Sequence, residues 1–93
     1  MTITDISRTS PHWILAVDDD PKILNVTEII LKKEGYSVAL ALSVAEAQKT
    51  LQERRIDLVL LDVMLSDGDG FSFCKAIKEN VETRDVPVIL LTA

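Results

Sequence analysis

The sequence predicts an α/β fold in which a parallel β-sheet carries helices on both faces. Short, wholly apolar runs alternate with longer segments whose apolar residues recur at helical spacing. The order is strand then helix, three times over, followed by one more strand, and this alternation is typical of a parallel sheet. With 93 residues and 47% apolar content, the chain has room for one domain with a single core.

The first strand and helix are predicted in the first third of the chain. Residues 13–17 form an apolar run too short for a helix, which suits a strand buried on both faces. Asp20 and Pro21 provide an N-cap and a proline at the first helical position, and Gly35 closes the helix as a C-cap. The helix is marked by Ile23, Val26 and Ile30, joined by Leu24 and Leu31. Residues 1–12 are polar and aperiodic, so we expect a flexible tail there and the domain over residues 13–93.

The second strand and helix follow directly. Residues 36–41 alternate between apolar and polar more than the other strand candidates, which fits an edge strand. Ser43 and Glu46 form a capping box, in which each side chain accepts a hydrogen bond from the backbone amide of the other residue. The helix is expected to run to about Arg54, with Val44, Ala47 and Leu51 on one face.

The remaining elements are a third strand, a loop, a third helix and a fourth strand. Residues 58–61 and 88–91 are wholly apolar and read as buried strands. The loop over residues 62–70 contains Asp67 and Asp69, which lie next to glycines and are predicted to be turn residues. The third helix is marked by Phe73, Cys74, Ile77 and Val81.

The expected strand order is 2-1-3-4, with the more alternating second strand at an edge. The first strand then lies between the second and the third, and the right-handed crossovers leave it in opposite directions. The crevice at the carboxyl ends of the first and third strands becomes the switch point, where sheets of this kind bind ligands. Asp18, Asp19 and Asp62 follow these two strands, so they are expected to meet in the crevice.

The chemistry of such a cluster follows from its charge. Converging carboxylates raise one another's pKa unless a cation lies between them, and Mg²⁺ favours carboxylates, a carbonyl and waters as ligands. An aspartate beside such a metal can attack a phosphoryl group in line. Asp62 stands alone at its strand end and is the expected nucleophile, whereas Asp18 and Asp19 are the expected metal ligands.

Composition excludes other classes of function. The net charge is −5 and the basic residues are scattered, which argues against direct nucleic-acid binding. No apolar run approaches the roughly 20 residues of a membrane span. A single cysteine cannot form an internal disulfide, and the first residues lack a secretion signal, so we expect a cytoplasmic protein.

Four motifs resemble the receiver domain of two-component response regulators. They are Leu15–Pro21 (LAVDDDP), Leu58–Leu65 (LVLLDVML), Asp69–Phe71 (DGF) and Pro87–Ala93 (PVILLTA). The resemblance covers residues 13–93 and rests on the order and spacing of all four motifs. It implies a flavodoxin-like fold. Compared with a full receiver domain, this chain is expected to lack the last helix, strand and helix after its fourth strand.

The resemblance also implies a role for each site residue. Asp62 would be the phosphoacceptor, and it would hold Mg²⁺ together with Asp18, Asp19 and the backbone carbonyl of Met64. The Thr92 hydroxyl would sense the phosphoryl group. Such domains take the phosphoryl group from a histidine kinase, a phosphotransfer protein or a small phosphodonor. They are signalling domains that catalyse their own phosphoryl uptake and loss.

Two departures from the family pattern carry expectations of their own. Ser66 stands where the family often has proline, which would leave the loop after Asp62 less rigid. The family's phosphoryl-binding lysine would lie beyond the fourth strand, and no lysine of this chain lies at the carboxyl end of a strand. An uncovered fourth strand is a liability in a sheet. We therefore expect self-association, through the exposed sheet edge or by exchange of elements between copies.

Two other functions are compatible with parts of this pattern. Metal-dependent phosphatases with an aspartyl nucleophile also place it at a strand end, but they usually carry a second acid two residues later, where this chain has Met64. A receiver-derived interaction module without phosphoryl chemistry is the other alternative. Repeated turnover of phosphate esters would favour the phosphatase, and failure to bind Mg²⁺ and a beryllofluoride mimic would favour the interaction module.

Overall fold

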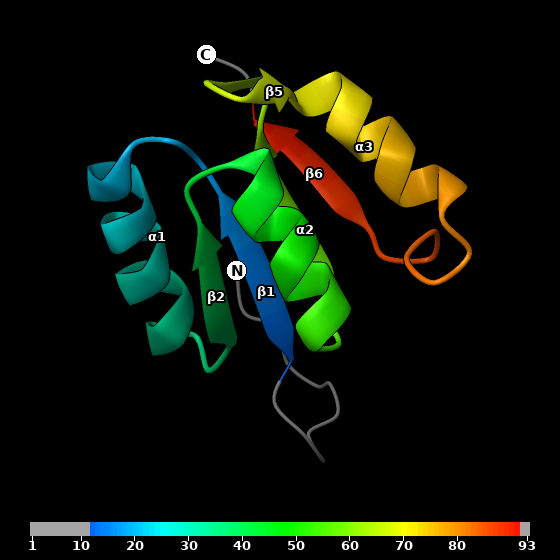
Figure 1. Cartoon of the computed structure of the whole chain (residues 1–93). Helices are drawn as coiled ribbons and strands as arrows, with labels where there is room; N and C mark the ends of the chain where they lie inside the picture. The colour runs from blue at the N-terminus through cyan, green and yellow to red at the C-terminus, as the bar shows by residue number, and fades with distance from the viewer. Residues whose placement is uncertain (1–11, 92–93) are drawn as a thin grey trace.

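The computed structural model describes residues 12–91, and the described elements follow the predicted order (Figure 1). The sheet contains β1 (Trp13–Val17), β2 (Ser37–Ala41), β3 (Leu58–Asp62) and β6 (Val88–Leu91). The helices are α1 (Pro21–Lys33), α2 (Val44–Glu53) and α3 (Gly70–Glu79). A short antiparallel hairpin, β4 (Met64–Leu65) with β5 (Gly68–Asp69), lies between β3 and α3. Of the predicted tail, only His12 falls within the described residues.

The sheet has the predicted strand order. Its strands are arranged β2-β1-β3-β6, and all three neighbouring pairs are parallel. β1 lies between β2 and β3. The crossover from β1 to β2 and the crossover from β2 to β3 therefore run in opposite directions across the sheet. Val17 pairs in register with Ala41 and Leu61, and Asp62 pairs with Leu91. The carboxyl ends of β1 and β3 are therefore level with each other, which is the geometry that the predicted switch point requires.

The core confirms helices on both faces of the sheet. The face beneath α2 and α3 contributes the fully buried Leu15, Val17, Val59 and Leu61. These side chains form one cluster with Ala47 of α2 and with Phe73 and Ile77 of α3. Because side chains alternate along a strand, Ile14 and Ala16 point to the opposite face; both are buried, as is Leu24 of α1.

The ends of α1 follow the sequence signals. The Asp20 side chain accepts a hydrogen bond from the amide of Lys22, and Pro21 occupies the first helical position. Gly35 has a φ of +96°, and its amide donates to the carbonyl of Lys32. The amide of Tyr36 donates to the carbonyl of Leu31, which completes a Schellman C-cap.

The surface of α1 differs from the simplest expectation of an amphipathic helix. Leu24 is its buried residue, whereas Ile23, Val26 and Ile30, which marked the helix in the sequence, are about half exposed. Helical spacing predicts that these residues share a face, but it does not specify what that face meets. α1 contacts β1 and β2. Within residues 12–91, it does not cover the same face of β3 and β6.

Two further details correct the sequence analysis. The capping box of α2 is half formed, since Ser43 accepts from the Glu46 amide but the Glu46 carboxylate accepts from the amide of Leu42. α3 ends at Glu79, so Val81 is not helical and is largely exposed. The side chain of Asn80 accepts from the Glu82 amide and turns the chain away from the helix axis. Within residues 12–91, none of the helices has the length and apolar content needed to cross a membrane.

Candidate functional site

Three aspartates meet at the carboxyl end of the sheet. One carboxylate oxygen from each of Asp18, Asp19 and Asp62 lies within 4.8 Å of the others. The register explains this convergence, because Asp18 and Asp62 directly follow Val17 and Leu61, which are register partners on β1 and β3. Residues more than forty positions apart in the sequence therefore share one edge of the sheet.

Asp18 is the buried member of the cluster. Its exposed fraction is 8%, its amide donates to the carbonyl of Ala41, and its Oδ1 accepts from the amide of Asp20 at 2.9 Å. Burial raises the pKa of the Asp18 carboxyl above its usual value. The Asp20 amide acts in the opposite direction, and the charges of Asp62, Asp19 and Asp20 raise the pKa further. The site therefore disfavours its own negative charge.

Asp62 ends β3 and is held by the loop that follows it. The amide of Met64 donates to Asp62 Oδ1 at 3.3 Å, and the amide of Gly70 donates to the carbonyl of Val63 at 2.7 Å. A Cβ atom at position 70 would lie 2.5 Å from the carbonyl oxygen of Asp62 and 2.6 Å from Cα of Val63. Only glycine fits here, because this close backbone approach brings the start of α3 against the end of β3.

The loop contains one feature that sequence reasoning missed. Ser66 and Asp67 form the turn of the β4–β5 hairpin, and Asp67 reaches across to the first residues of α2. No described residue of this turn has a positive φ, so the hairpin lacks the glycine signature of the commonest tight turns. The dipeptide Asp67-Gly68 was a weak signal, since it marked a turn but not its position or its distant partner. Asp69 caps α3 by accepting from the amide of Phe71.

The donor set fits a hard divalent cation. Clustered carboxylate oxygens are the ligands that Mg²⁺ prefers, and a cation among them would offset both the burial and the neighbouring negative charges that raise the pKa of Asp18. Met64 lies two residues after the end of β3, and its carbonyl as a ligand stays a prediction. Thr92 lies outside the described residues, so its predicted role stays a prediction as well.

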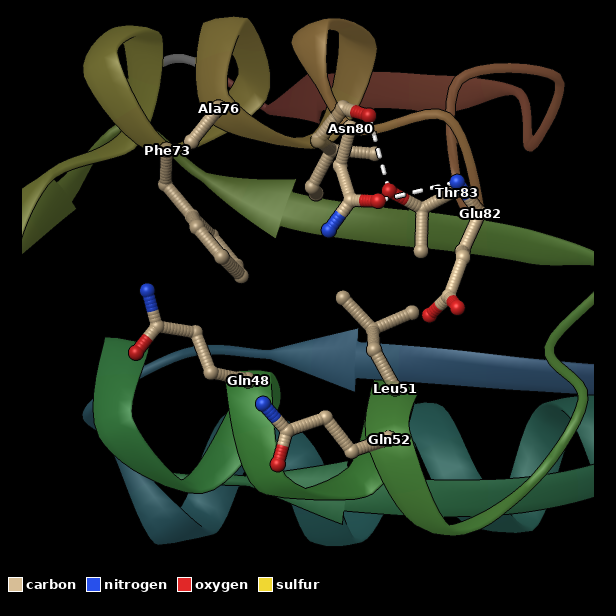
Figure 2. A pocket seen from close by; sticks show the side chains of 9 residues that line it. Gln48, Leu51, Gln52, Phe73, Ala76, Asn80, Glu82 and Thr83 are labelled. Carbon is tan, nitrogen blue, oxygen red and sulfur yellow. Dashed lines mark hydrogen bonds between the residues drawn. The ribbon is translucent and has the colours of Figure 1, made fainter.

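A separate cleft of about 240 Å³ lies between α2 and α3. Leu51 and Phe73 point toward each other from the two helices, and Gln48 and Gln52 line the α2 side (Figure 2). None of the three clustered aspartates lines this cleft. The acidic cluster at the sheet edge is therefore the site that combines convergent titratable groups with the switch point of the fold.

Comparison with known proteins agrees with this fold. The family described as response regulator receiver domain matches residues 14–93. The chain is 39% identical over 80 residues to the DNA-binding dual master transcriptional regulator RpaA of Synechocystis sp., covering 86% of this chain and 33% of that protein. The chain spans about a third of the length of the curated relatives it matches.

Solved structures show the same similarity. The N-terminal domain of a response regulator receiver protein from Methanoculleus marisnigri has a TM-score of 0.86 at 42% identity, covering 90% of this chain and 68% of that chain. The chemotaxis response regulator CheY4 of Vibrio cholerae has a TM-score of 0.83 at 30% identity, covering 87% of this chain and 68% of that chain. From its sequence, its sheet topology and these relatives, the chain belongs to the response regulator receiver domain family.

Proposed function

We propose that this receiver domain accepts a phosphoryl group on Asp62, in a pocket where Asp18, Asp19, Asp62 and the carbonyl of Met64 hold Mg²⁺. The convergence of three carboxylates within 4.8 Å at the switch point carries this proposal. Membership of the receiver family supports the phosphoacceptor role, since these are signalling domains of two-component systems. The Thr92 hydroxyl, which follows the register partner of Asp62 in the sequence, is proposed to contact the phosphoryl group.

Each residue of the proposed pocket has a separate role in the phosphoryl transfer. A carboxylate oxygen of Asp62 attacks phosphorus in line, the bond from phosphorus to the leaving group breaks with its electron pair, and an aspartyl phosphate forms. The Met64 amide, which donates to Asp62 Oδ1, restricts the orientation of that carboxylate. The Asp20 amide does the same for Asp18. Bound Mg²⁺ would neutralise charge on the oxygens of the transferring group.

Phosphorylation of the isolated chain tests the proposal. Incubation with Mg²⁺ and a small acyl phosphate is expected to add one phosphoryl group per chain, which intact mass spectrometry measures. Asp62→Asn should abolish the addition, whereas Asp85→Asn, a change at an exposed acid remote from the cluster, should not. Labelling of the Asp62→Asn variant at the rate of the unsubstituted chain would contradict the assignment. Continuous release of phosphate from esters would instead favour a phosphatase.

The physiological donor is proposed to be a histidine kinase or a phosphotransfer protein. This follows from the receiver family, whose solved members include the receiver domain of a signal transduction histidine kinase from Syntrophus aciditrophicus. The small-donor experiment needs no kinase, so it also tests whether the domain catalyses its own phosphoryl uptake. We propose that this reaction takes place in the cytoplasm, which is compatible with a single cysteine that cannot form an internal disulfide.

We also propose that the 93-residue chain self-associates through β6. Among the described residues, no strand pairs with the outer edge of β6, whose backbone groups are thereby open to a second chain. Ile89 and Leu91 are each about half exposed on the sheet face that α1 leaves uncovered. A second copy offers both a strand edge and an apolar face of matching chemistry.

A further inference from the structure

The hairpin that follows the acidic cluster is bound to α2 by one carboxylate. Asp67 Oδ1 accepts from the amide of Val44 at 2.9 Å, and Oδ2 accepts from the amide of Ala45 at 3.2 Å. These bonds join residues 22 and 23 positions apart and use both oxygens of the side chain. They lower the pKa of the Asp67 carboxyl, with the Val44 amide as the largest cause.

The helix does not depend on Asp67 alone for its N-terminal capping. Ser43 Oγ accepts from the Glu46 amide, and Glu46 Oε1 accepts from the Leu42 amide, so α2 already has caps from its own segment. The contribution that Asp67 makes beyond these caps is to fix where the hairpin lies. Gly68 packs beside it, since a Cβ atom there would lie 3.0 Å from Cγ2 of Val44.

The hairpin is continuous with the proposed phosphoryl site. β4 begins at Met64, whose amide donates to Asp62 Oδ1 and whose carbonyl is a proposed Mg²⁺ ligand. Met64 pairs with Asp69 across the hairpin, and the neighbouring pair, Leu65 with Gly68, leads directly to the turn that contains Asp67. Figure 1 shows β5 at the same end of the molecule as the arrowheads of the sheet strands. A shift of the turn is therefore transmitted through a few bonded residues to two of the proposed ligands.

We propose that Asp67 is a positioning residue for the phosphoryl site, which acts by clamping the β4–β5 hairpin to the N-terminus of α2. The proposal rests on the function proposed above. The clamp holds Asp62 and the Met64 carbonyl in place, whereas Asp18 and Asp19 follow β1 and do not depend on the hairpin. Releasing the clamp should weaken Mg²⁺ binding without removing a ligand, as the loss of outer-shell partners does at other metal sites.

Mg²⁺ affinity of matched variants tests this role. Asp67→Ala removes the clamp, and Ser43→Ala removes a cap of the same helix end without touching the hairpin. By isothermal titration calorimetry, Asp67→Ala should weaken Mg²⁺ binding about tenfold, whereas Ser43→Ala should leave the dissociation constant within about twofold of the unsubstituted value. Equal affinities for Asp67→Ala and the unsubstituted chain would overturn the proposal, because Asp67 would then be a structural cap only.

A second measurement uses the unsubstituted chain and so does not depend on how well a variant folds. Coupling between two sites is reciprocal, so a clamp that favours Mg²⁺ binding must itself be strengthened by Mg²⁺. Hydrogen exchange at the amides of Val44 and Ala45 should therefore slow when Mg²⁺ is added, by about the factor measured in the affinity experiment. Exchange at these two amides that does not respond to Mg²⁺ would overturn the proposal.

The outcomes also separate this inference from the proposed function. If the unsubstituted chain binds Mg²⁺ and is labelled on Asp62, but Asp67→Ala keeps the Mg²⁺ affinity and exchange at Val44 and Ala45 does not respond to Mg²⁺, only the positioning role fails. If the unsubstituted chain binds no Mg²⁺, both proposals fail together.

Discussion

At the scale of single residues, Asp18 is the member of the acidic cluster that the fold buries. It is the buried charged side chain among residues 12–91, and burial raises its pKa more than any neighbouring charge does. A raised folded-state pKa means that ionised Asp18 destabilises the fold at neutral pH. This destabilisation fades as the pH falls through the folded-state pKa toward the ordinary value of 3.8.

Asp18→Asn should therefore have opposite effects on the metal-free and metal-bound protein. Asparagine keeps an oxygen that can accept from the Asp20 amide but carries no charge. At pH 7 without metal, the variant should melt a few degrees higher than the unsubstituted chain, and the rise in melting temperature on adding Mg²⁺ should be lost. Calorimetry in a chelator and in Mg²⁺ measures both effects. A metal-free variant that melts lower would contradict the charge argument.

Asp67 has the reverse pH dependence. Its pKa is lowered by amide hydrogen bonds, so its contribution to stability is present above 3.8 and is lost as the pH falls through the lowered pKa. The difference in unfolding free energy between the unsubstituted chain and Asp67→Asn should be constant above about pH 5 and should shrink below it. Urea unfolding at a series of pH values measures this difference. A difference that grows on acidification would contradict the assignment of these bonds.

At the scale of elements, two glycines have distinct reasons for being glycine. Gly35 follows the end of α1 with a φ of +96°, and a Cβ atom at this position would meet no heavy atom within 4 Å, so only its backbone conformation restricts it. Gly70 opens α3 against the backbone of Asp62 and Val63, so steric contact restricts it. The first glycine shapes a helix end, and the second sets the distance between a helix and the proposed phosphoacceptor.

Substitution by alanine should separate these two reasons. Gly35→Ala should lower the free energy of unfolding by about 1 kcal/mol and leave Mg²⁺ binding unchanged. Gly70→Ala should lower it by about 1 to 3 kcal/mol, because backbone atoms cannot move aside cheaply, and should also weaken Mg²⁺ binding. Denaturant unfolding and calorimetric titration of the two variants measure these effects. Unchanged Mg²⁺ affinity in Gly70→Ala would show that the end of β3 tolerates displacement.

The elements that the sequence predicted well were those with local signals. Solid apolar runs marked β1, β3 and β6, and a more alternating run marked the edge strand β2. Caps at Asp20, Gly35 and Ser43 marked helix ends. The hairpin after β3 was not predicted, because its position depends on a contact between Asp67 and residues more than twenty positions away. No local pattern contains that information. The half-exposed apolar residues of α1 were missed for the same reason, since periodicity shows which residues share a face but not their neighbours.

At the scale of the whole molecule, the strand order alone places the residues of the site close together. An order of β2-β1-β3-β6 makes the ends of β1 and β3 adjacent, and the sequence places aspartates at both ends. Strand order was predictable because the crossover rule leaves few alternatives and the more alternating strand belongs at an edge. The predicted role of Thr92 rests on the family resemblance alone, because strand order does not indicate it and Thr92 lies outside the described residues.

Self-association of the chain is a prediction at the same scale. Light scattering over a range of concentrations should show dimers or larger species, because no strand within residues 12–91 pairs with the outer edge of β6 and such an edge can recruit another chain. Ile89→Lys, which places a charge on the half-exposed face of β6, should shift the equilibrium toward monomers. Val81→Lys is a matched control at an exposed apolar residue away from the sheet. A monomer at every concentration would contradict the prediction.

The most direct test of the shared pocket is an NMR titration of the ¹⁵N-labelled chain with Mg²⁺. Amide signals of Asp19, at the end of β1, and of Val63, at the end of β3, should shift together with a single dissociation constant. Asp62→Asn should greatly weaken the response at both strand ends. Shifts confined to one strand end, or two independent dissociation constants, would contradict a pocket shared by Asp18, Asp19 and Asp62.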